Sequence, residues 1–292
     1  MSDDARIDVV WDMETSDPDD FLTLLLLLGH PAVRLKAVTI TPGSTAQVGL
    51  VRRALGWFGV DIPVGAHNLD HPKPCVSSWH HKAYGEAPPS RDAEPGGALL
   101  RRLCDEDTTL ITGGPLKNLG AAMALEGFRV GRLVAQGGFA GEGVVPPERQ
   151  LPAFRGRVTC PSFNLNGDPR SALQAFTFPG IGARRFVSKN VCHGVFYDGA
   201  LHARVGALRD RSRSLELIWQ GMAVYLAKTP AGKKFHDPLA ACCAIDERVG
   251  TWAEVELYRE RGEWGARLAP GSSTRIITGH DPERFLEVLL RT

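Results

Sequence analysis

Short apolar runs alternate with longer amphipathic stretches along most of this chain, and this alternation limits the folds that it can adopt. Runs rich in Val, Ile and Leu are candidate strands at residues 7–11, 35–40, 109–111, 132–135 and 185–187. Helices are expected at residues 19–28, 46–58, 97–104 and 119–126. Strands that alternate with helices usually pair in parallel, with helices on the sheet faces. We therefore predict an α/β fold with a mostly parallel open sheet. Without a repeat or linker-like tract, residues 1–292 are expected to form a single domain.

Two long segments interrupt this rhythm. Residues 67–95 are rich in Pro, His and Ser, and residues 138–161 are rich in Gly, Pro and Arg. Loops longer than about 15 residues are commonly functional in a compact domain. Because ligands of open α/β sheets bind beyond the carboxyl ends of strands, we expect both segments to border the binding site.

The charge balance and the cysteines exclude several classes of function. Lys and Arg number 34 against 33 Asp and Glu, which favours neither a nucleic acid nor an anionic membrane as partner. The densest apolar run, residues 21–28, is too short to span a bilayer. Acids stand at the amino terminus where a signal peptide needs basic residues, so we predict a cytoplasmic protein. Six cysteines without a CxxC pair indicate reduced thiols that pack in the core. A small-molecule ligand is the expected partner.

The sequence WDMETSDPDDF concentrates acids directly after the first strand. Asp12, Glu14, Asp17, Asp19 and Asp20 fall within nine residues. Carboxylates so close together repel one another unless a positive charge or a helix amino terminus compensates them. Oxygen ligands without His or Cys select a hard cation, so the segment predicts a Ca²⁺ site, with Mg²⁺ as the alternative. A solvated acidic turn that only caps a helix is the competing interpretation.

With this motif the chain resembles the inosine-uridine preferring nucleoside hydrolases. Further similar segments follow in the order of that family: TITPGS at residues 39–44, LITGGPLKNLGAAMAL at 110–125, SFNLNGDPRSA at 162–172 and FHDPLA at 235–240. The resemblance extends from about Val9 to Gly265. It implies the family's fold and a hydrolase that cleaves the N-glycosidic bond of a ribonucleoside. It also implies a homodimer or homotetramer.

The resemblance implies a metal site of four residues. Glu14 would contact Ca²⁺ and act as the general base, and Asp20 would chelate the ion through both oxygens. Asp237 would close the other side, and Gly113 would add its backbone carbonyl. In this chemistry a carboxylate takes a proton from water, the metal lowers the pKa of that water, and polar groups orient the ribose.

The resemblance also implies substrate contacts. Asp19 and Asn164 would hold sugar hydroxyls, and His236 would lie beside them as a catalytic residue. The other substrate-binding candidates are Ser44, Ser162, Phe163 and Tyr225. Tyr225 belongs to a helix face that either packs in the core or covers the base. Asn164 has a structural alternative as a turn residue, and His236 has one as a buried histidine.

The chain departs from the family's pattern at several positions. Glu14 replaces an Asp, and the stretch before the double Asp is one residue longer, so the base could be Asp12, Glu14 or Asp17. Gly113 stands where the family has Thr, and Ser44 stands where it has Asn.

The fourth departure concerns the sugar's 5′ side. Ser162 replaces a Glu that binds the 5′ end of the sugar in the family. Arg149, Arg155 and Arg157 lie in the same long segment, and guanidinium groups recognise phosphate, which suggests a substrate modified or phosphorylated at the 5′ position. A solvated flap is the alternative role for these arginines.

Other assignments stay open from the sequence. His80, His81 or a water could protonate the leaving base. The first strand and Asp12 also resemble the nucleophile loop of haloacid-dehalogenase phosphatases, with residues 110–112 and Lys117 as later motifs. A nucleoside- or sugar-binding module without catalysis is a further alternative.

Overall fold

The main sheet of the protein has eleven strands within residues 6–292, which are the residues that the computed structural model describes. Their order is β4-β3-β2-β1-β5-β6-β8-β13-β11-β12-β7. The bounds are β1 (Ile7–Met13), β2 (Val33–Ile40), β3 (Val64–Ala66), β4 (Glu94–Pro95), β5 (Thr108–Thr112), β6 (Val130–Gln136), β7 (Thr159–Cys160), β8 (Ile181–Val187), β11 (Gly250–Glu260), β12 (Glu263–Leu268) and β13 (Thr274–His280). A separate pair joins β9 (Phe196–Tyr197) to β10 (Lys233–Lys234). The acids Asp3 and Asp4, which contributed to the predicted location, lie outside the described residues.

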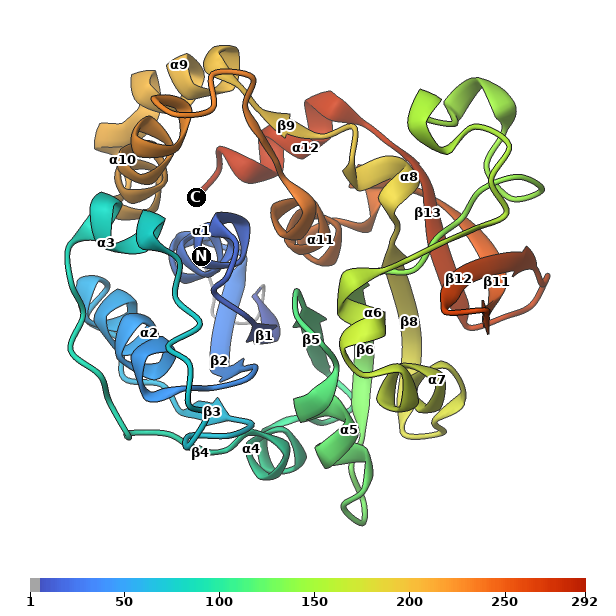
Figure 1. The fold of residues 1–292 in the computed structure, drawn as a ribbon, viewed down its shortest axis with the longest axis horizontal. Coiled ribbons are helices and arrows are strands. Elements are labelled where there is room, and N and C mark those ends of the chain that lie inside the picture. Colours follow the sequence, from blue (N-terminus) through green and yellow to red (C-terminus); the bar gives the residue numbers. More distant parts are fainter. Residues whose placement is uncertain (1–5) are drawn as a thin grey trace.

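Helices cover both faces of this sheet (Figure 1). On one face α1 (Pro18–Gly29) and α11 (His236–Ile245) pack against the central strands, α2 (Thr45–Trp57) packs against β3, and α10 (Arg213–Leu226) packs against α1. The other face carries α4 (Gly96–Leu103), α5 (Lys117–Met123) and α7 (Pro169–Thr177). The remaining helices are α3 (Ser78–Tyr84), α6 (Phe163–Gly167), α8 (Lys189–Cys192), α9 (Gly199–Leu208) and α12 (Pro282–Leu289).

Strand β1 marks the position where the strand order reverses. It pairs in parallel with β2 on one side and with β5 on the other. After β1 the chain continues to β2, in one half of the sheet. Strand β5 lies on the opposite side of β1 and begins the other half. In an open α/β sheet a crevice opens beyond the carboxyl ends of the strands at such a point, and ligands bind there.

Helix α1 shows how the local sequence builds the structure around this crevice. It begins at Pro18, whose fixed φ suits the first helical turn, and Asp19 and Asp20 follow at the positive end of the helix dipole. The residues from Phe21 to Leu27 are all buried. This part of the helix is apolar on nearly every side because it lies between the sheet and other helices.

The strand and helix predictions are confirmed, with shifts of a few residues at their ends. The sequence did not predict the antiparallel end of the sheet, where β13, β11, β12 and β7 pair. It also did not predict the short parallel strands β3 and β4. Strands of two or three residues are too short to produce a recognisable pattern.

The two long segments contain short elements of their own. Residues 67–95 include α3 and β4, and residues 138–161 include two 3₁₀ turns (Pro147–Arg149 and Pro152–Phe154) and β7. Within residues 6–292, no helix has both the length and the apolar character needed to cross a lipid bilayer. The six cysteines are free thiols, five of them buried, as predicted.

Candidate active site

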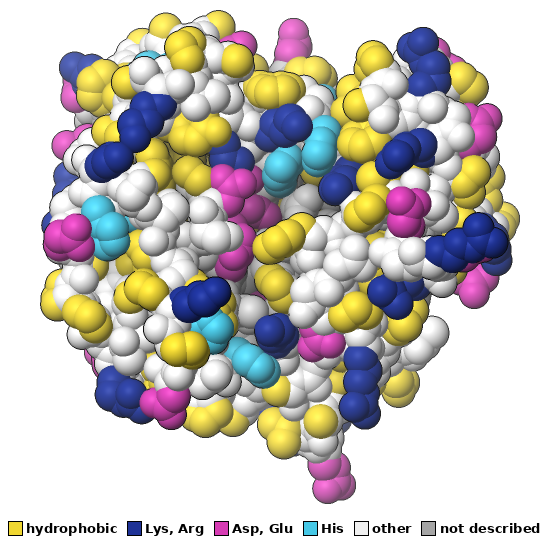
Figure 2. All heavy atoms as spheres, in the orientation of Figure 1, with side chains coloured by type: hydrophobic (Ala, Val, Ile, Leu, Met, Phe, Trp, Pro, Cys, Tyr) yellow, Lys and Arg dark blue, Asp and Glu magenta, His cyan; other side chains and the backbone are white. Residues whose placement is uncertain are grey.

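A cavity of about 400 Å³ opens at the carboxyl ends of β1, β5, β6 and β8. Figure 2 shows this hollow near the middle of one face of the molecule, with Asp and Glu side chains inside it and His and Lys or Arg side chains beside them. Its lining residues are Glu14, Ser16, Asp17, Asp19, Asp20, Gly113, Gln136, Ser162, Phe163, Asn164, Lys189, His193, His236 and Asp237. The cavity thus combines residues from the beginning, the middle and the end of the chain.

Three buried carboxylates meet in this cavity. Asp19, Asp20 and Asp237 each place one oxygen within 4.8 Å of the other two. Burial raises the pKa of Asp20 well above its usual range, and repulsion from Asp237 adds to the effect. Burial likewise raises the pKa of Asp237, with a further contribution from Asp19. Such a group of acids is unfavourable without additional positive charge.

Lys233 supplies part of that charge. Its side chain is 5% exposed, and its ammonium lies 3.1 Å from Asp19 Oδ1 and 3.1 Å from Asp17 Oδ2. Burial opposes the charged form, but Asp19 and Asp17 outweigh it and raise the pKa of Lys233. The lysine also donates to the Lys234 carbonyl (2.9 Å), which fixes its direction. Asp19 is therefore held by an internal counter-charge, and Lys233 is a site residue that the sequence analysis missed.

Gly113 directly follows β5 and lies against the acid cluster. A Cβ atom at this position would lie 2.8 Å from Asp237 Oδ1 and 2.9 Å from Asp20 Oδ1, so only glycine fits this conformation without a shift. The Gly113 carbonyl accepts a hydrogen bond from Asn164 Nδ2 (2.8 Å). The same Asn164 Nδ2 also donates to Gln136 Oε1 (2.7 Å). The structure thus brings Gly113 and Asn164 together in the cavity.

The three carboxylates that the sequence left as alternative bases have different environments. Glu14 lines the cavity, and its backbone N–H donates to Asp20 Oδ1 (3.0 Å), while its Oε1 accepts from the Ser16 hydroxyl (2.5 Å). Burial raises the pKa of Glu14, and nearby Asp17 and Asp19 add to this effect. Asp17 is paired with Lys233, as described above.

Asp12 is fully buried and does not line the cavity. Its Oδ1 accepts hydrogen bonds from Thr39 Oγ1 (2.7 Å) and Asn118 Nδ2 (2.8 Å). Burial raises the pKa of Asp12 to about 7 despite these bonds. Its backbone carbonyl accepts from Gly113 N (2.8 Å) and joins the ends of β1 and β5. The geometry therefore gives Asp12 a role in positioning the two strand ends.

Two histidine rings form part of the cavity wall. His236 and His193 stack with ring centroids 4.9 Å apart. The backbone N–H of His236 donates to Asp19 Oδ2 (3.2 Å), and its ring Nδ1 lies 3.7 Å from the same oxygen. Burial lowers the pKa of His236 to about 4 and that of His193 to about 3, so both rings are neutral near pH 7.

Two other predicted substrate contacts lie away from this cavity. Ser44 is buried as the N-cap of α2: its hydroxyl accepts from Gln47 N (3.3 Å) and donates to the Pro74 carbonyl. Tyr225 lines a neighbouring cavity of about 260 Å³ between α3 and α10. Ser16 lines both cavities, so the second one adjoins the first at the Glu14 side.

The candidates for leaving-group protonation are also separate from the cavity lining. His80 is fully buried, with Nδ1 3.0 Å from Ser77 Oγ, and burial lowers its pKa to about 4. His81 Nδ1 lies 3.0 Å from Glu86 Oε2 on the half-exposed side of α3. Neither histidine lines the two cavities.

The three arginines of residues 138–161 that the sequence suggested for phosphate binding do not line the main cavity. Arg155 and Arg157 are exposed, and Arg149 lines a different cavity together with Asn190 and Val191 of α8. The cation that does line the main cavity is Lys189, directly after Ser188 at the end of β8. Its position after the predicted strand 185–187 was the signal that could have identified it, since residues at the carboxyl ends of strands surround the crevice.

Comparison with known proteins adds family membership to this geometry. A profile of the family described as inosine-uridine preferring nucleoside hydrolase matches residues 9–287. The chain belongs to this family. It is therefore an N-ribosyl hydrolase that acts on small-molecule nucleosides, and neither the phosphatase nor the binding module is favoured.

Solved structures of nucleoside hydrolases share this fold. A plant nucleoside hydrolase aligns with a TM-score of 0.71 and 18% identity over 97% of both chains. A purine-preferring ribonucleoside hydrolase from Gardnerella vaginalis aligns with a TM-score of 0.70 and 17% identity, also over 97% of both chains. An inosine-uridine preferring nucleoside hydrolase from Bacillus anthracis aligns with a TM-score of 0.71 and 18% identity over 98% of both. No curated protein matches in a sequence comparison.

Proposed function

We propose that this nucleoside hydrolase releases ribose from a ribonucleoside with Glu14 as general base and a divalent cation, Ca²⁺, held by Glu14, Asp20, Asp237 and the Gly113 carbonyl. The proposal is carried by one observation. Two of the proposed ligands, Asp20 and Asp237, lie with Asp19 in a group of buried carboxylates whose oxygens are within 4.8 Å of one another, next to Gly113 and at the point where the strand order reverses.

The residues present fit a hard cation. Asp237 Oδ1 is buried and has no hydrogen-bond partner within residues 6–292, although it lies in a group of carboxylates. The surrounding donors are oxygens, which Ca²⁺ and Mg²⁺ prefer, and the flexible coordination of Ca²⁺ suits a mixed carboxylate and carbonyl set. When bound, such an ion lowers the pKa of a coordinated water and neutralises the acids.

Glu14 is the best-placed base of the three acids considered. It lines the cavity beside the acid cluster, whereas Asp12 lies behind the cavity and Asp17 is paired with Lys233. Because burial raises its pKa, the Glu14 carboxylate accepts a proton more readily than an exposed glutamate does. The Ser16 hydroxyl that donates to Oε1 fixes the direction of the side chain. Glu14 would take the proton from the attacking water.

Asp19 and Asn164 are proposed to hold the ribose hydroxyls. Lys233 and the backbone N–H of His236 fix the Asp19 carboxylate, so its remaining lone pairs have a defined direction. The Asn164 amide uses its N–H groups on Gly113 and Gln136, which leaves Oδ1 without a partner in the described chain. Prearranged acceptors of this kind orient a sugar at little entropic cost.

The ring groups around the cavity are proposed to contact the rest of the substrate. Phe163 is 70% exposed at the cavity rim, where an apolar ring can cover a bound nucleoside. Within residues 6–292 His236 Nε2 is buried without a hydrogen-bond partner, and it would offer a polar contact. Tyr225 would face the base in the neighbouring cavity. Ser44 would act indirectly, through the start of α2.

Release of reducing sugar tests this function. Inosine, uridine, guanosine and cytidine, and separately their 5′-monophosphates, are incubated with the protein in Ca²⁺ or in EDTA, and Glu14→Gln is compared with Glu256→Gln, which alters an exposed glutamate on β11. We expect ribose release only with the metal, loss of at least about 100-fold in kcat for Glu14→Gln, and no change for Glu256→Gln. Nucleoside binding without sugar release would instead support the binding module, and release of phosphate from nucleotides would support the phosphatase.

Three broader expectations remain part of this proposal: a cytoplasmic location, a role in purine or pyrimidine salvage, and a homodimer or homotetramer. Fractionation, growth on nucleosides and sedimentation analysis test them in turn.

A further inference from the structure

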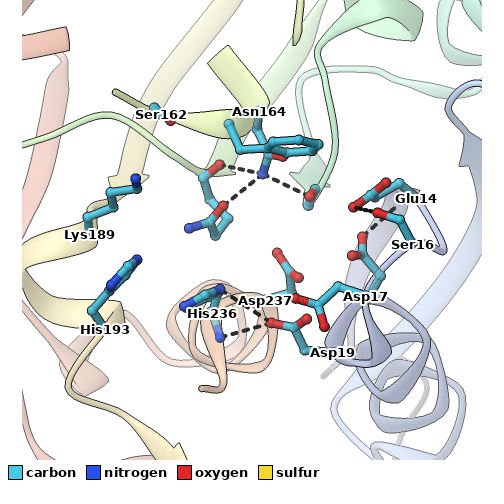
Figure 3. A pocket seen from close by; sticks show the side chains of 14 residues that line it. Glu14, Ser16, Asp17, Asp19, Ser162, Asn164, Lys189, His193, His236 and Asp237 are labelled. Atoms are coloured by element: carbon cyan, nitrogen blue, oxygen red, sulfur yellow. Dashed lines mark hydrogen bonds and ion pairs between the residues drawn. The ribbon is translucent and has the colours of Figure 1, made fainter. Parts of the chain in front are cut away.

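The two ends of the main cavity differ in charge. Figure 3 shows Glu14 and Ser16 at one end, Asp19 and Asp237 in the middle, and Lys189, His193 and Ser162 at the other end. The acids are therefore concentrated at one end and in the middle, whereas the far end presents a lysine, a histidine and a hydroxyl. A ligand that matches the whole cavity needs an anionic group at that far end.

Lys189 is the charged residue that lines the cavity at this end, and Lys234 lies behind it against His193. Lys189 is half-buried at the start of α8, and no carboxylate of residues 6–292 lies within ion-pair distance of its ammonium. This contrasts with Lys233 in the same region, which contacts two aspartates. A lysine that lines a cavity without an internal partner is free to bind an anion from solution.

Two hydrogen-bond donors accompany Lys189. The Ser162 hydroxyl oxygen accepts from Gly138 N (3.2 Å), and within the described chain its own proton has no acceptor, although the residue is only 2% exposed. The Lys234 ammonium lies 3.4 Å from His193 Nδ1, and because an ammonium can only donate, the proton of the neutral ring resides on Nε2. The far end thus offers an ammonium, an O–H and an N–H.

The shape of a furanoside connects this end to the reacting site. The ring carries its base at C1′ and its 5′ substituent at C4′, on either side of the ring oxygen, with both hydroxyls at the opposite edge. A sugar held by its hydroxyls on the central acids, with its base beyond Ser16 near Tyr225, directs the 5′ substituent toward Lys189. This orientation rests on the proposed function.

We propose that Lys189, Ser162 and His193 form a binding site for a 5′-phosphate, so that the preferred substrate is a ribonucleoside 5′-monophosphate. Three donors match the three terminal oxygens of a phosphate monoester, and lysine binds phosphate as a point charge. The reaction cleaves the same C1′–N bond: water adds its oxygen to C1′, the base leaves with a proton, and ribose 5-phosphate is released with the ester intact.

The test compares kcat/KM for inosine 5′-monophosphate and inosine, and for the uridine pair, in Ca²⁺. The variants are Lys189→Met, Lys189→Arg and Ser162→Ala. The matched control is Arg149→Met, which removes a positive charge on the other side of α8. Folding of each variant is checked by its thermal transition. A charge-assisted contact predicts that Lys189→Met reduces the preference for the monophosphate about 10- to 100-fold. Lys189→Arg should retain most of the preference, and Arg149→Met should leave it within about twofold.

Two results would overturn the phosphate site while the hydrolase function stands. One is efficient hydrolysis of inosine with poor hydrolysis of its monophosphate. The other is a monophosphate preference that Arg149→Met reduces and Lys189→Met does not. If no riboside is hydrolysed, the proposed function fails. The phosphate site is then tested separately by calorimetry, which compares the affinity of the protein for ribose 5-phosphate with its affinity for ribose. Binding of ribose 5-phosphate at least about tenfold tighter than ribose, and lost in Lys189→Met, supports it, whereas equal binding refutes it.

Discussion

Replacing Asp237 with Asn should change the stability of the protein in opposite directions with and without Ca²⁺. Without the ion, Asp237 is a buried carboxylate within 4.8 Å of the oxygens of Asp19 and Asp20. The substitution removes a like charge from this group and preserves the shape of the side chain. With the ion, the same substitution removes a proposed ligand.

The magnitude follows from the separation of the charges. Two unit charges 4.8 Å apart repel by about 3 kcal/mol at an effective dielectric constant of about 20. Protonation limits this cost because the pKa values of Asp20 and Asp237 are already raised by burial and repulsion. We therefore expect Asp237→Asn to stabilise the metal-free protein by about 1–3 kcal/mol at pH 7. At about 100 times the dissociation constant, Ca²⁺ should stabilise the wild-type protein by about 2.7 kcal/mol and the variant much less.

Urea denaturation in EDTA and in Ca²⁺ measures both effects. Asp246→Asn is the matched control, because Asp246 caps the opposite end of α11 and its contacts with Arg248 and Arg284 lower its pKa to about 2. That variant should be destabilised equally in both buffers. The reasoning is refuted if Asp237→Asn loses stability in EDTA, or if Ca²⁺ stabilises it as much as it stabilises the wild-type protein.

Three further predictions concern single side chains. Lys233→Met should destabilise the metal-free protein by about 3 kcal/mol or more because the buried Asp19 carboxylate loses its partner, whereas Lys234→Met should cost less than about 1 kcal/mol; urea denaturation in EDTA measures both. Gly113→Ala should lower Ca²⁺ affinity at least about tenfold in calorimetry, since its Cβ would displace the carboxylates; an unchanged affinity would contradict the proposed metal site. The buried His30 has a pKa lowered to about 4 by burial, below the unfolded value of about 6.5, so it reduces stability as pH falls through this window. His30→Gln should therefore gain up to about 3 kcal/mol relative to wild type between pH 7 and pH 4, and parallel pH profiles would refute this assignment.

The sequence was sufficient to predict the architecture and the acids at the start of α1, because both depend on local patterns, whereas Asp237 was expected only from the family resemblance. Apolar runs identified the central strands, and the DPDD segment identified the start of α1 with its acids. No local sequence pattern predicts that Lys233 and Lys189 lie at the site. Their roles depend on which distant residues surround them, and a lysine in a short loop is usually solvated.

The same limit explains the misplaced residues. The arginines of the long loop were expected at the cavity from composition alone, but the backbone directs Arg149 to the other side of α8. Ser44 matched a family position, yet its hydroxyl caps α2. A motif identifies a backbone position, whereas side-chain direction depends on packing that the motif does not contain.

The segment that completes the acid cluster also carries its neutralising charge. Asp237 closes the group of carboxylates, and Lys233 precedes it by four residues, more than 200 residues after Asp19. Docking of this segment therefore brings the third carboxylate and an ammonium to the cavity together. The complete group of acids is thus assembled only together with the ammonium that offsets part of its charge.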